Sequence, residues 1–271
     1  MTSWRDARPL HLLRLPTDGW APFIAAAGTA GFFLLLTAEL AWPAFACAVV
    51  AIVAILGWLW DSDQAAPLPL ATVADGVQLP TSATGRSSHS WWAVVILIAV
   101  DMTVFASFVF SHLHVSMAAD ICPPAGATLP ATRWPVVAGI LMMAGSFAMV
   151  LATRALRSAE PRRQRLLRAL VLLALACTAG GIGLDMASQI GAGLDPTAQA
   201  WSATVGVFLG YGVFHGAVLA LMGGYLLVRS SSGRLQPSAR ATLDNTALLW
   251  HCVTAQGVIA MLAVHLMPRL T

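Results

Sequence analysis

The stretch that decides the fold is Trp91–Met117, WWAVVILIAVDMTVFASFVFSHLHVSM, in which Asp101 is the only acidic or basic residue apart from histidine. A helix of this length is long enough to cross about 30 Å of hydrocarbon. Six further apolar stretches are long enough to span, at 21–41, 42–60, 135–156, 166–190, 201–228 and 245–267. The sequence therefore predicts an all-α polytopic membrane bundle of seven transmembrane helices.

The overall composition agrees with a membrane class. Of the 271 residues, 58% are apolar and only 10% are charged, whereas soluble domains carry about 25% charged residues. This composition excludes a soluble enzyme and a disordered chain. Nothing at the N-terminus resembles a cleaved signal peptide. The four cysteines are scattered without a C-x-x-C pair, so we expect neither a disulfide framework nor a zinc site.

Polar segments divide the chain into four parts. Residues 1–20 form a cytoplasmic N-terminal segment, and residues 21–60 a two-helix transmembrane hairpin with Trp42-Pro43 as its hinge. Residues 61–90 are a polar cytoplasmic linker, and residues 91–268 a five-helix transmembrane bundle. Tryptophans at or near many predicted span ends, Trp201 and Trp250 among them, are expected to form interfacial belts.

Arginine placement predicts the orientation. All 15 basic residues are arginines. Thirteen of them lie in or beside the segments that the predicted spans place on one side of the membrane. Cationic segments resist translocation, so this side faces the cytoplasm. Seven spans then place the N-terminus in the cytoplasm and the C-terminus in the periplasm. The pI near 8.9 reflects this topology and does not indicate a nucleic-acid partner.

Three acids lie within or at the ends of the predicted spans: Glu39, Asp101 and Asp185. An ionised carboxylate near the bilayer centre costs at least about 2.5–3.5 kcal/mol, so such a side chain faces the bundle interior, pairs with a partner or stays protonated. Asp101 is closest to the membrane middle. Two interpretations remain open for Asp101 and Asp185: a proton-linked site, or a hydrogen-bonded acid that holds helices together.

The seven histidines do not form a recognisable metal site. A haem or copper site needs several ligands at one depth, and no H-x-x-x-H pair occurs. We therefore expect no metal site and no catalytic residues in this chain. His215 lies at a depth comparable with Asp101 on another helix, which predicts a hydrogen-bonded contact, either direct or through Ser107 or water.

Small residues recur in the fifth and sixth spans, including the run from Thr178 to Gly183 and the glycines Gly210, Gly212 and Gly216. Small residues allow helices to approach closely, which is the interpretation we favour. The alternative, a substrate path through broken helices as in transporters, is weakened by the absence of proline from the sixth span.

Several short patterns, taken in order, resemble one membrane-protein family. The Trp91–His112 stretch, with its mid-helix acid Asp101, is similar to the third helix of subunit III of haem–copper terminal oxidases. Phe214-His215-Gly216 looks like the Phe-His-Gly of that family, and Trp250-His251 like its Trp-His near the start of the last helix. The family usually has Glu where this chain has Asp101. The chain also resembles the C-terminal part of fused subunit I+III chains.

The resemblance implies a non-redox accessory subunit. Two helices and five helices would surround a V-shaped, lipid-filled cleft, with bound phospholipid and no haem or copper in this chain. The metals would lie in partner subunits: oxidase subunit I is catalytic, subunit II is a second partner, and cytochrome c interacts indirectly. Arg168 and Arg229, at inner helix ends, are candidates for lipid head-group contact. The implied location is the bacterial inner membrane.

The resemblance implies cytochrome c oxidase, with support of the catalytic subunit, of proton uptake and of oxygen access as the role. A quinol oxidase subunit III is an alternative within the family. From another class, a proton-coupled membrane transporter using Asp101 and Asp185 is an alternative, and so is a haem- or copper-handling assembly protein. An absorption band in the isolated chain would indicate the last of these.

Overall fold

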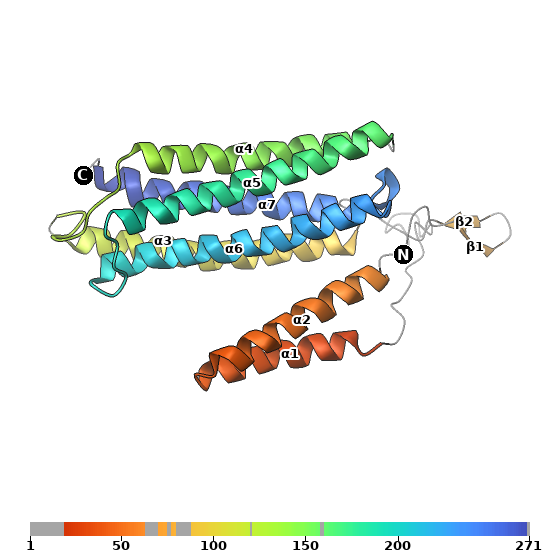
Figure 1. The fold of residues 1–271 in the computed structure, drawn as a ribbon, viewed down its shortest axis with the longest axis horizontal. Helices are drawn as coiled ribbons and strands as arrows, with labels where there is room; N and C mark the ends of the chain where they lie inside the picture. Colours follow the sequence, from red (N-terminus) through yellow and green to blue (C-terminus); the bar gives the residue numbers. More distant parts are fainter. Residues whose placement is uncertain are drawn as a thin grey trace. The chain divides into compact units, whose positions relative to one another are not determined.

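A computed structural model of the chain describes residues 19–62, 70–74, 77–79, 88–119, 121–157 and 160–269. Contacts divide the chain into two compact units, Met1–Ala83 and Thr84–Thr271. We name them the hairpin unit and the five-helix unit (Figure 1). The predicted cytoplasmic segment 1–20 lies almost entirely outside the described residues.

The described elements are mainly helical. The long helices are α1 (Ala21–Thr37), α2 (Ala41–Ser62), α3 (His89–Ala118), α4 (Arg133–Ala155), α5 (Pro161–Gly191), α6 (Ala200–Ser231) and α7 (Ala241–Met261). Short elements are the strands β1 (Ala71–Ala74) and β2 (Val77–Leu79) and the helical turns η2 (Pro237–Ala239), η3 (Leu262–Leu266) and η4 (Met267–Arg269). Within the described residues, six helices are long and apolar enough to cross a membrane, and α1 is an apolar helix below that length. The chain is therefore a multi-pass, all-α membrane protein.

In the hairpin unit, the backbones of α1 and α2 approach each other closely. A Cβ added to Gly28 of α1 would lie 3.0 Å from the Cys47 carbonyl oxygen and 3.0 Å from the Ala51 nitrogen of α2. Ala44 and Ala51 are buried at this interface, while most large apolar side chains of both helices are exposed. Small residues thus bring the two helices together, as is typical of packing in lipid.

The turn of the hairpin lies earlier than predicted. Helix α1 ends at Thr37, and Glu39 adopts a positive φ of 61° in the turn before α2. Trp42 and Pro43 belong to the first turn of α2, where proline is tolerated because the first N–H groups of a helix need no partner within it. Glu39 is therefore a turn residue outside both helices, and Trp42-Pro43 is not the hinge.

The linker is shorter and more structured than predicted. Helix α2 extends to Ser62 and α3 begins at His89. Between them, β1 and β2 pair antiparallel, with Thr72 opposite Gln78. The rest of the predicted linker is mostly outside the described residues.

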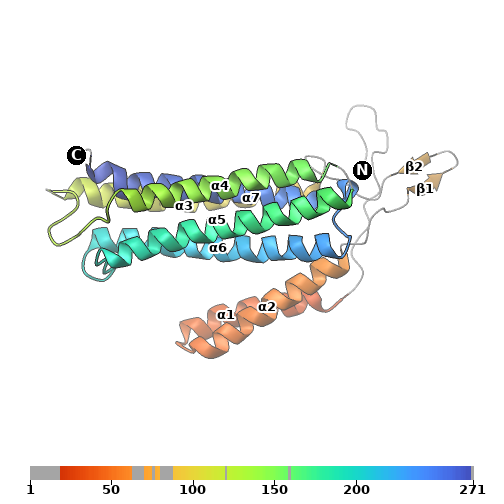
Figure 2. The same cartoon turned by 45° about the horizontal axis from the view of Figure 1, so that its top comes forward.

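The five-helix unit is a bundle of roughly parallel and antiparallel helices. In two views α4 lies beside α5, and the end of α7 lies at the same end as the α3–α4 connection (Figures 1 and 2). Its main apolar core is built from α4, α5, α6 and α7 around Met149, Leu167, Leu226 and Trp250. A second apolar cluster joins α3 to α6 through Phe105 and Phe208.

Close packing of α4 on α5 follows from the small residues of both helices. A Cβ on Gly145 would lie 2.6 Å from Thr178 Oγ1, and a Cβ on Gly181 would lie 2.8 Å from the Ala138 carbonyl oxygen. No side chain larger than hydrogen fits at either position without movement of a neighbour. The glycine-rich run of the fifth span therefore serves helix packing, as expected.

One predicted boundary and two predicted belt residues need correction. The fifth helix begins before the predicted span of 166–190, because α5 starts at Pro161 and carries the arginines of residues 162–168 on its first two turns. Trp201 and Trp250 are 1% and 0% exposed. They are therefore core residues and not part of an interfacial belt.

Candidate functional site

The polar site in the middle of the five-helix unit is built around Asp101 of α3. Its side chain is 17% exposed, and that of His215 on α6 is 7% exposed. Asp101 Oδ1 lies 3.1 Å from His215 Nε2. The structure thus brings the two residues into direct contact. Ser107 takes no part in it, because its hydroxyl donates to the Val104 carbonyl on the exposed face of α3.

Two further side chains complete the Asp101 cluster. The Tyr211 hydroxyl donates to Asp101 Oδ1 at 2.5 Å, and the Gln256 amide of α7 donates to Asp101 Oδ2 at 2.7 Å. Both carboxyl oxygens are therefore engaged, and one side chain ties together α3, α6 and α7. We call Asp101, Tyr211, His215 and Gln256 the Asp101 cluster.

The hydrogen bonds determine how many protons the Asp101–His215 pair holds. His215 Nδ1 lies 3.0 Å from the Tyr211 carbonyl oxygen, and a carbonyl only accepts, so Nδ1 carries a hydrogen. One proton then remains to be shared between His215 Nε2 and Asp101 Oδ1. Whichever atom holds it, the pair is electrically neutral, either as carboxylate with imidazolium or as acid with imidazole. Neutrality removes most of the cost of placing an acid at this depth.

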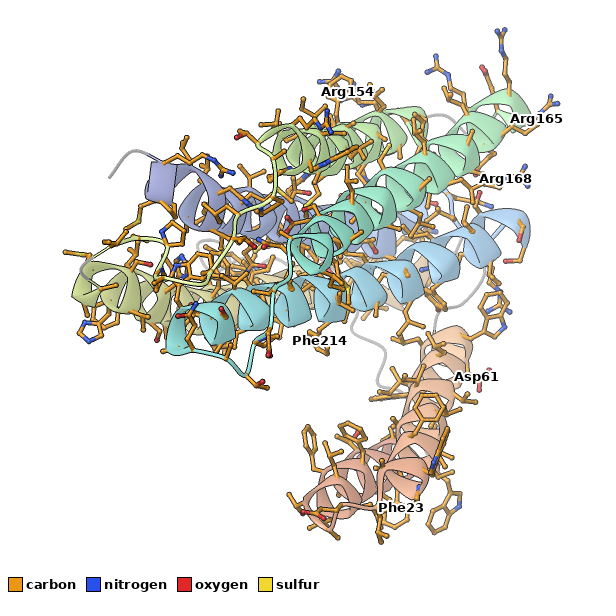
Figure 3. The ribbon with its side chains drawn as sticks, turned by 60° about the vertical axis from the view of Figure 1, so that its left-hand side comes forward. Phe23, Asp61, Arg154, Arg165, Arg168 and Phe214 are labelled. Carbon is orange, nitrogen blue, oxygen red and sulfur yellow. The ribbon has the colours of Figure 1, made fainter. Side chains whose placement is uncertain are left out.

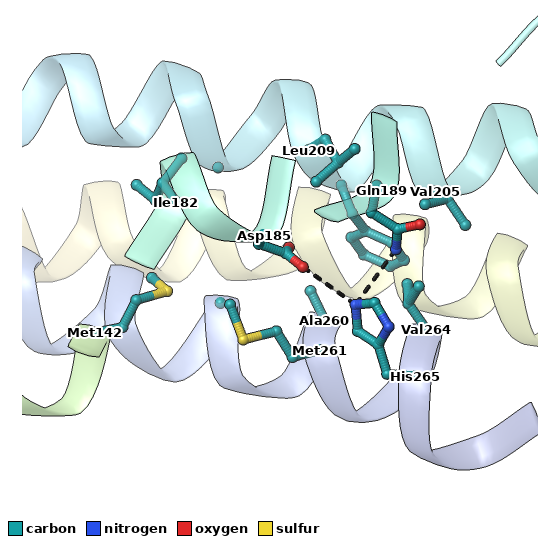
Figure 4. Close-up of a pocket in the computed structure, with 13 residues that line it drawn as sticks. Met142, Ile182, Asp185, Gln189, Val205, Leu209, Ala260, Met261, Val264 and His265 are labelled. Atoms are coloured by element: carbon teal, nitrogen blue, oxygen red, sulfur yellow. Dashed lines mark hydrogen bonds and ion pairs between the residues drawn. The ribbon is translucent and has the colours of Figure 1, made fainter. Parts of the chain in front are cut away.

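A second cluster of the same residue types lies at the other acid, Asp185 of α5. His265 Nε2, in η3 after α7, is 3.2 Å from Asp185 Oδ1 and 3.3 Å from Gln189 Nε2. Figure 4 shows these three side chains converging from α5 and η3 on one pocket. We call Asp185, Gln189 and His265 the Asp185 cluster.

The remaining motif residues make ties between helices. The Trp250 indole N–H donates to Thr178 Oγ1 at 3.0 Å, which joins α7 to α5. His251 Nδ1 lies 2.6 Å from Ser146 Oγ, which joins α7 to α4. A Cβ on Gly216 would lie 2.7 Å from Ile182 Cδ1, so this glycine allows α6 to approach α5. Phe214 is 62% exposed on the outer surface of α6 (Figure 3).

The two arginines expected at lipid head groups differ. Arg168 is half-buried, and it projects from α5 near Arg165 (Figure 3). Its role at head groups stays a prediction. Arg229 is 1% exposed, and its guanidinium donates to Thr242 Oγ1 and to the Arg234 carbonyl. Because these groups hold it inside the unit, Arg229 does not fit a head-group role.

Sequence reasoning missed Tyr211, Gln256 and Gln189 as members of the two clusters. A signal was present for two of them, because Tyr211 precedes His215 by four positions and Gln189 follows Asp185 by four positions. Residues four apart share a helix face. Gln256 is a buried amide on another helix, and its partner depends on helix packing alone.

Within the described residues, no group of three or more histidine, cysteine, aspartate or glutamate side chains is arranged to hold a metal ion. The Asp101 cluster can hold one proton and fix three helices. Comparison with known proteins found no matching family model and no matching curated protein. The functional argument therefore depends on the site itself.

Proposed function

We propose that this chain is an accessory, non-redox subunit of the subunit III type in a proton-pumping haem–copper oxygen reductase. The single observation that carries the proposal is the Asp101 cluster. In it, the mid-helix acid of α3 contacts the histidine of the Phe-His-Gly pattern on α6, 3.1 Å away. The depth of the two residues along their helices predicts this contact, and both residues also belong to the patterns that carry the resemblance.

The division of the chain supports the same proposal. The hairpin unit contains α1 and α2, and the five-helix unit contains α3 to α7, as the two-plus-five layout of the resemblance implies. Seven spans, a lipid-filled cleft with bound phospholipid, a cytoplasmic N-terminus and the bacterial inner membrane belong to this proposal.

The chemistry of the Asp101 cluster defines what the chain contributes. A neutral, fully hydrogen-bonded acid stabilises the bundle, which gives the catalytic subunit a rigid lipid-covered neighbour. Oxygen partitions into hydrocarbon, so such a neighbour supports oxygen access to oxidase subunit I. Haem and copper lie in partner subunits, and cytochrome c is the electron donor we propose, with quinol as the alternative.

Purification of the tagged chain from its native membrane in mild detergent tests the proposal. We expect haem and copper to co-purify, with a reduced-minus-oxidised spectrum and oxygen consumption. Removal of this chain should leave oxygen reduction in place but make it inactivate faster during turnover. A colourless chain that purifies without partners would contradict the proposal and favour a proton-coupled transporter. Haem bound by the isolated chain would indicate an assembly protein.

A matched pair of variants connects this test to the site. D101N keeps a side-chain acceptor for Tyr211 and offers an N–H to His215 Nε2, so we expect it to co-purify with the oxidase. D101L removes every side-chain hydrogen-bonding group at this position, so we expect less of the chain in the complex. Equal recovery of both variants would show that the Asp101 cluster does not support assembly.

A further inference from the structure

The Asp185 cluster borders a small, partly open cavity of about 40 Å³. Apolar residues of α4 to α7 and η3, Val205 and Ala260 among them, line the rest of it (Figure 4). A buried water needs at least about 10–15 Å³ of such volume and two or more polar partners. The cavity is therefore large enough for one or two water molecules and too small for an organic ligand.

Two residues that line the cavity each carry a buried polar atom with no hydrogen-bond partner within the described part of the chain. These atoms are His265 Nδ1 and Gln189 Oε1, and their residues are 4% and 1% exposed. A buried polar group without a partner costs about 1–3 kcal/mol, so native structures normally supply one. Water satisfies both atoms, because it donates to the amide oxygen and either donates to or accepts from the imidazole nitrogen.

The backbone at His265 differs from that at His215. His215 lies in the regular helix α6, and its Nδ1 bonds the carbonyl four residues earlier. His265 lies in the π-helical turn η3, and π-turns occur frequently at functional sites. Because no carbonyl among the described residues engages His265 Nδ1, none of them fixes a hydrogen on this atom.

We propose that the cavity is a buried water site that relays protons through His265 to Asp185. A hydrated proton gives its proton to His265 Nδ1, and the hydrogen on Nε2 passes to Asp185 Oδ1, 3.2 Å away. The O–H bond of hydronium and the Nε2–H bond break, while an Nδ1–H bond and an Oδ1–H bond form. The ring stays neutral, and the carboxylate becomes an acid.

Gln189 fits the state after the transfer. Its NH₂ group then donates to the unprotonated His265 Nε2, 3.3 Å away, because an imidazole nitrogen without a hydrogen accepts. The inference concerns residues of this chain only and does not require the oxidase assignment.

Solid-state NMR of the full chain, labelled with ¹⁵N-histidine and placed in lipid bilayers, tests the water site. Transfer from water protons to the imidazole nitrogens should give a cross-peak at His265 Nδ1 and none at His215 Nδ1. H265Q identifies the His265 resonances. The absence of a water cross-peak at His265, or an equal cross-peak at His215, would overturn the proposal.

Two glycines of α6 provide matched variants. Gly212 lines the cavity and Gly210 does not, and a Cβ at either position meets nothing within 4 Å. G212V should abolish the His265 cross-peak by filling the cavity, whereas G210V should keep it. If G212V fails to fold, as judged by loss of the His215 resonances, A260V fills the same cavity from α7. Survival of the cross-peak in a folded cavity-filling variant would contradict the proposal.

Discussion

The Asp101 and Asp185 clusters use the same three residue types with opposite results. In the Asp101 cluster both carboxyl oxygens are engaged, and His215 has a hydrogen-bond partner on each ring nitrogen. In the Asp185 cluster His265 has a partner on one ring nitrogen only among the described residues, and the site borders a cavity. We therefore infer that the second ring nitrogen of the histidine decides the role of an Asp–His–Gln cluster. With a protein partner on that nitrogen the cluster only holds helices together, and without one it can exchange protons with water.

This difference shows that the role of an intramembrane acid cannot be inferred from its depth alone. Asp101 lies nearer the middle of its helix, yet its hydrogen bonds leave it little freedom. Asp185 lies nearer the end of α5, and its neighbours leave one nitrogen available for exchange. Variants of both clusters test this contrast.

The largest effect is expected for D101L. It removes the carboxyl partner of Tyr211, His215 and Gln256, at about 1–3 kcal/mol for each unsatisfied group, reduced by relaxation in lipid and by the residue-101 backbone carbonyl, which still accepts from Tyr211 at 3.2 Å. We expect the free energy of unfolding to fall by roughly 3 kcal/mol, measured by circular dichroism against the mole fraction of SDS.

D101N is the control for D101L. We expect it to lower the free energy of unfolding by less than about 1 kcal/mol. Its side-chain oxygen still accepts from Tyr211, and Gln256 Oε1, which has no partner among the described residues, becomes an acceptor when its amide rotates. A D101N variant as unstable as D101L would mean that the charge or proton of Asp101, and not its hydrogen bonds, stabilises the bundle.

D185L should destabilise the chain less than D101L, by about 1–2 kcal/mol. Only His265 contacts the Asp185 carboxylate in the described structure, at 3.2 Å, and water in the cavity can replace part of the lost contact. The same unfolding experiment gives the comparison. Equal losses for the two variants would remove the distinction between the clusters.

Y211F removes the hydroxyl that donates to Asp101 Oδ1 and to the Asp101 backbone carbonyl, and it keeps the ring, which stacks on Phe105. We expect a loss of about 1 kcal/mol and an infrared shift of the Asp101 carboxyl band, because the hydroxyl donates directly to Oδ1 at 2.5 Å. S107A is the matched control, since its hydroxyl bonds only the Val104 carbonyl among the described groups. An equal shift in S107A would indicate that the band does not report the cluster.

The smallest effect on stability is expected for a variant near Asp195, an exposed acid in the α5–α6 connection. This acid serves as a reference for the two buried acids. Its pKa is lowered because the Thr197 hydroxyl and backbone N–H donate to Oδ1. A lowered pKa adds stability above the ordinary pKa of about 4, and that stability is lost as the pH falls through the folded-state pKa. T197A should raise the pKa of Asp195, as measured by ¹³C NMR titration. D195N identifies the resonance, and an unchanged midpoint in T197A would contradict the assignment.

Much of the fold could be predicted because the membrane imposes simple rules. Length and hydropathy located every long helix, and most of the predicted helix ends are correct to within a few residues. The reason is that each span must form its backbone hydrogen bonds within itself in lipid. The errors lay where hydropathy is uninformative. Residues 162–165 are polar and yet helical, and the turn at Glu39 depends on a backbone conformation that no pattern of apolar residues reveals.

The sequence by itself determined the membrane class, the approximate helices and the shared depth of Asp101 and His215, because hydrocarbon thickness converts position along a helix into depth. Only the tertiary structure decided which donors surround each acid. The rotation of α7 brings Gln256 to Asp101, and the π-turn at its end places His265 at the cavity with no partner for Nδ1 among the described residues. Helix rotation depends on packing at small residues summed over several helices, so the difference between the two clusters appears only in three dimensions.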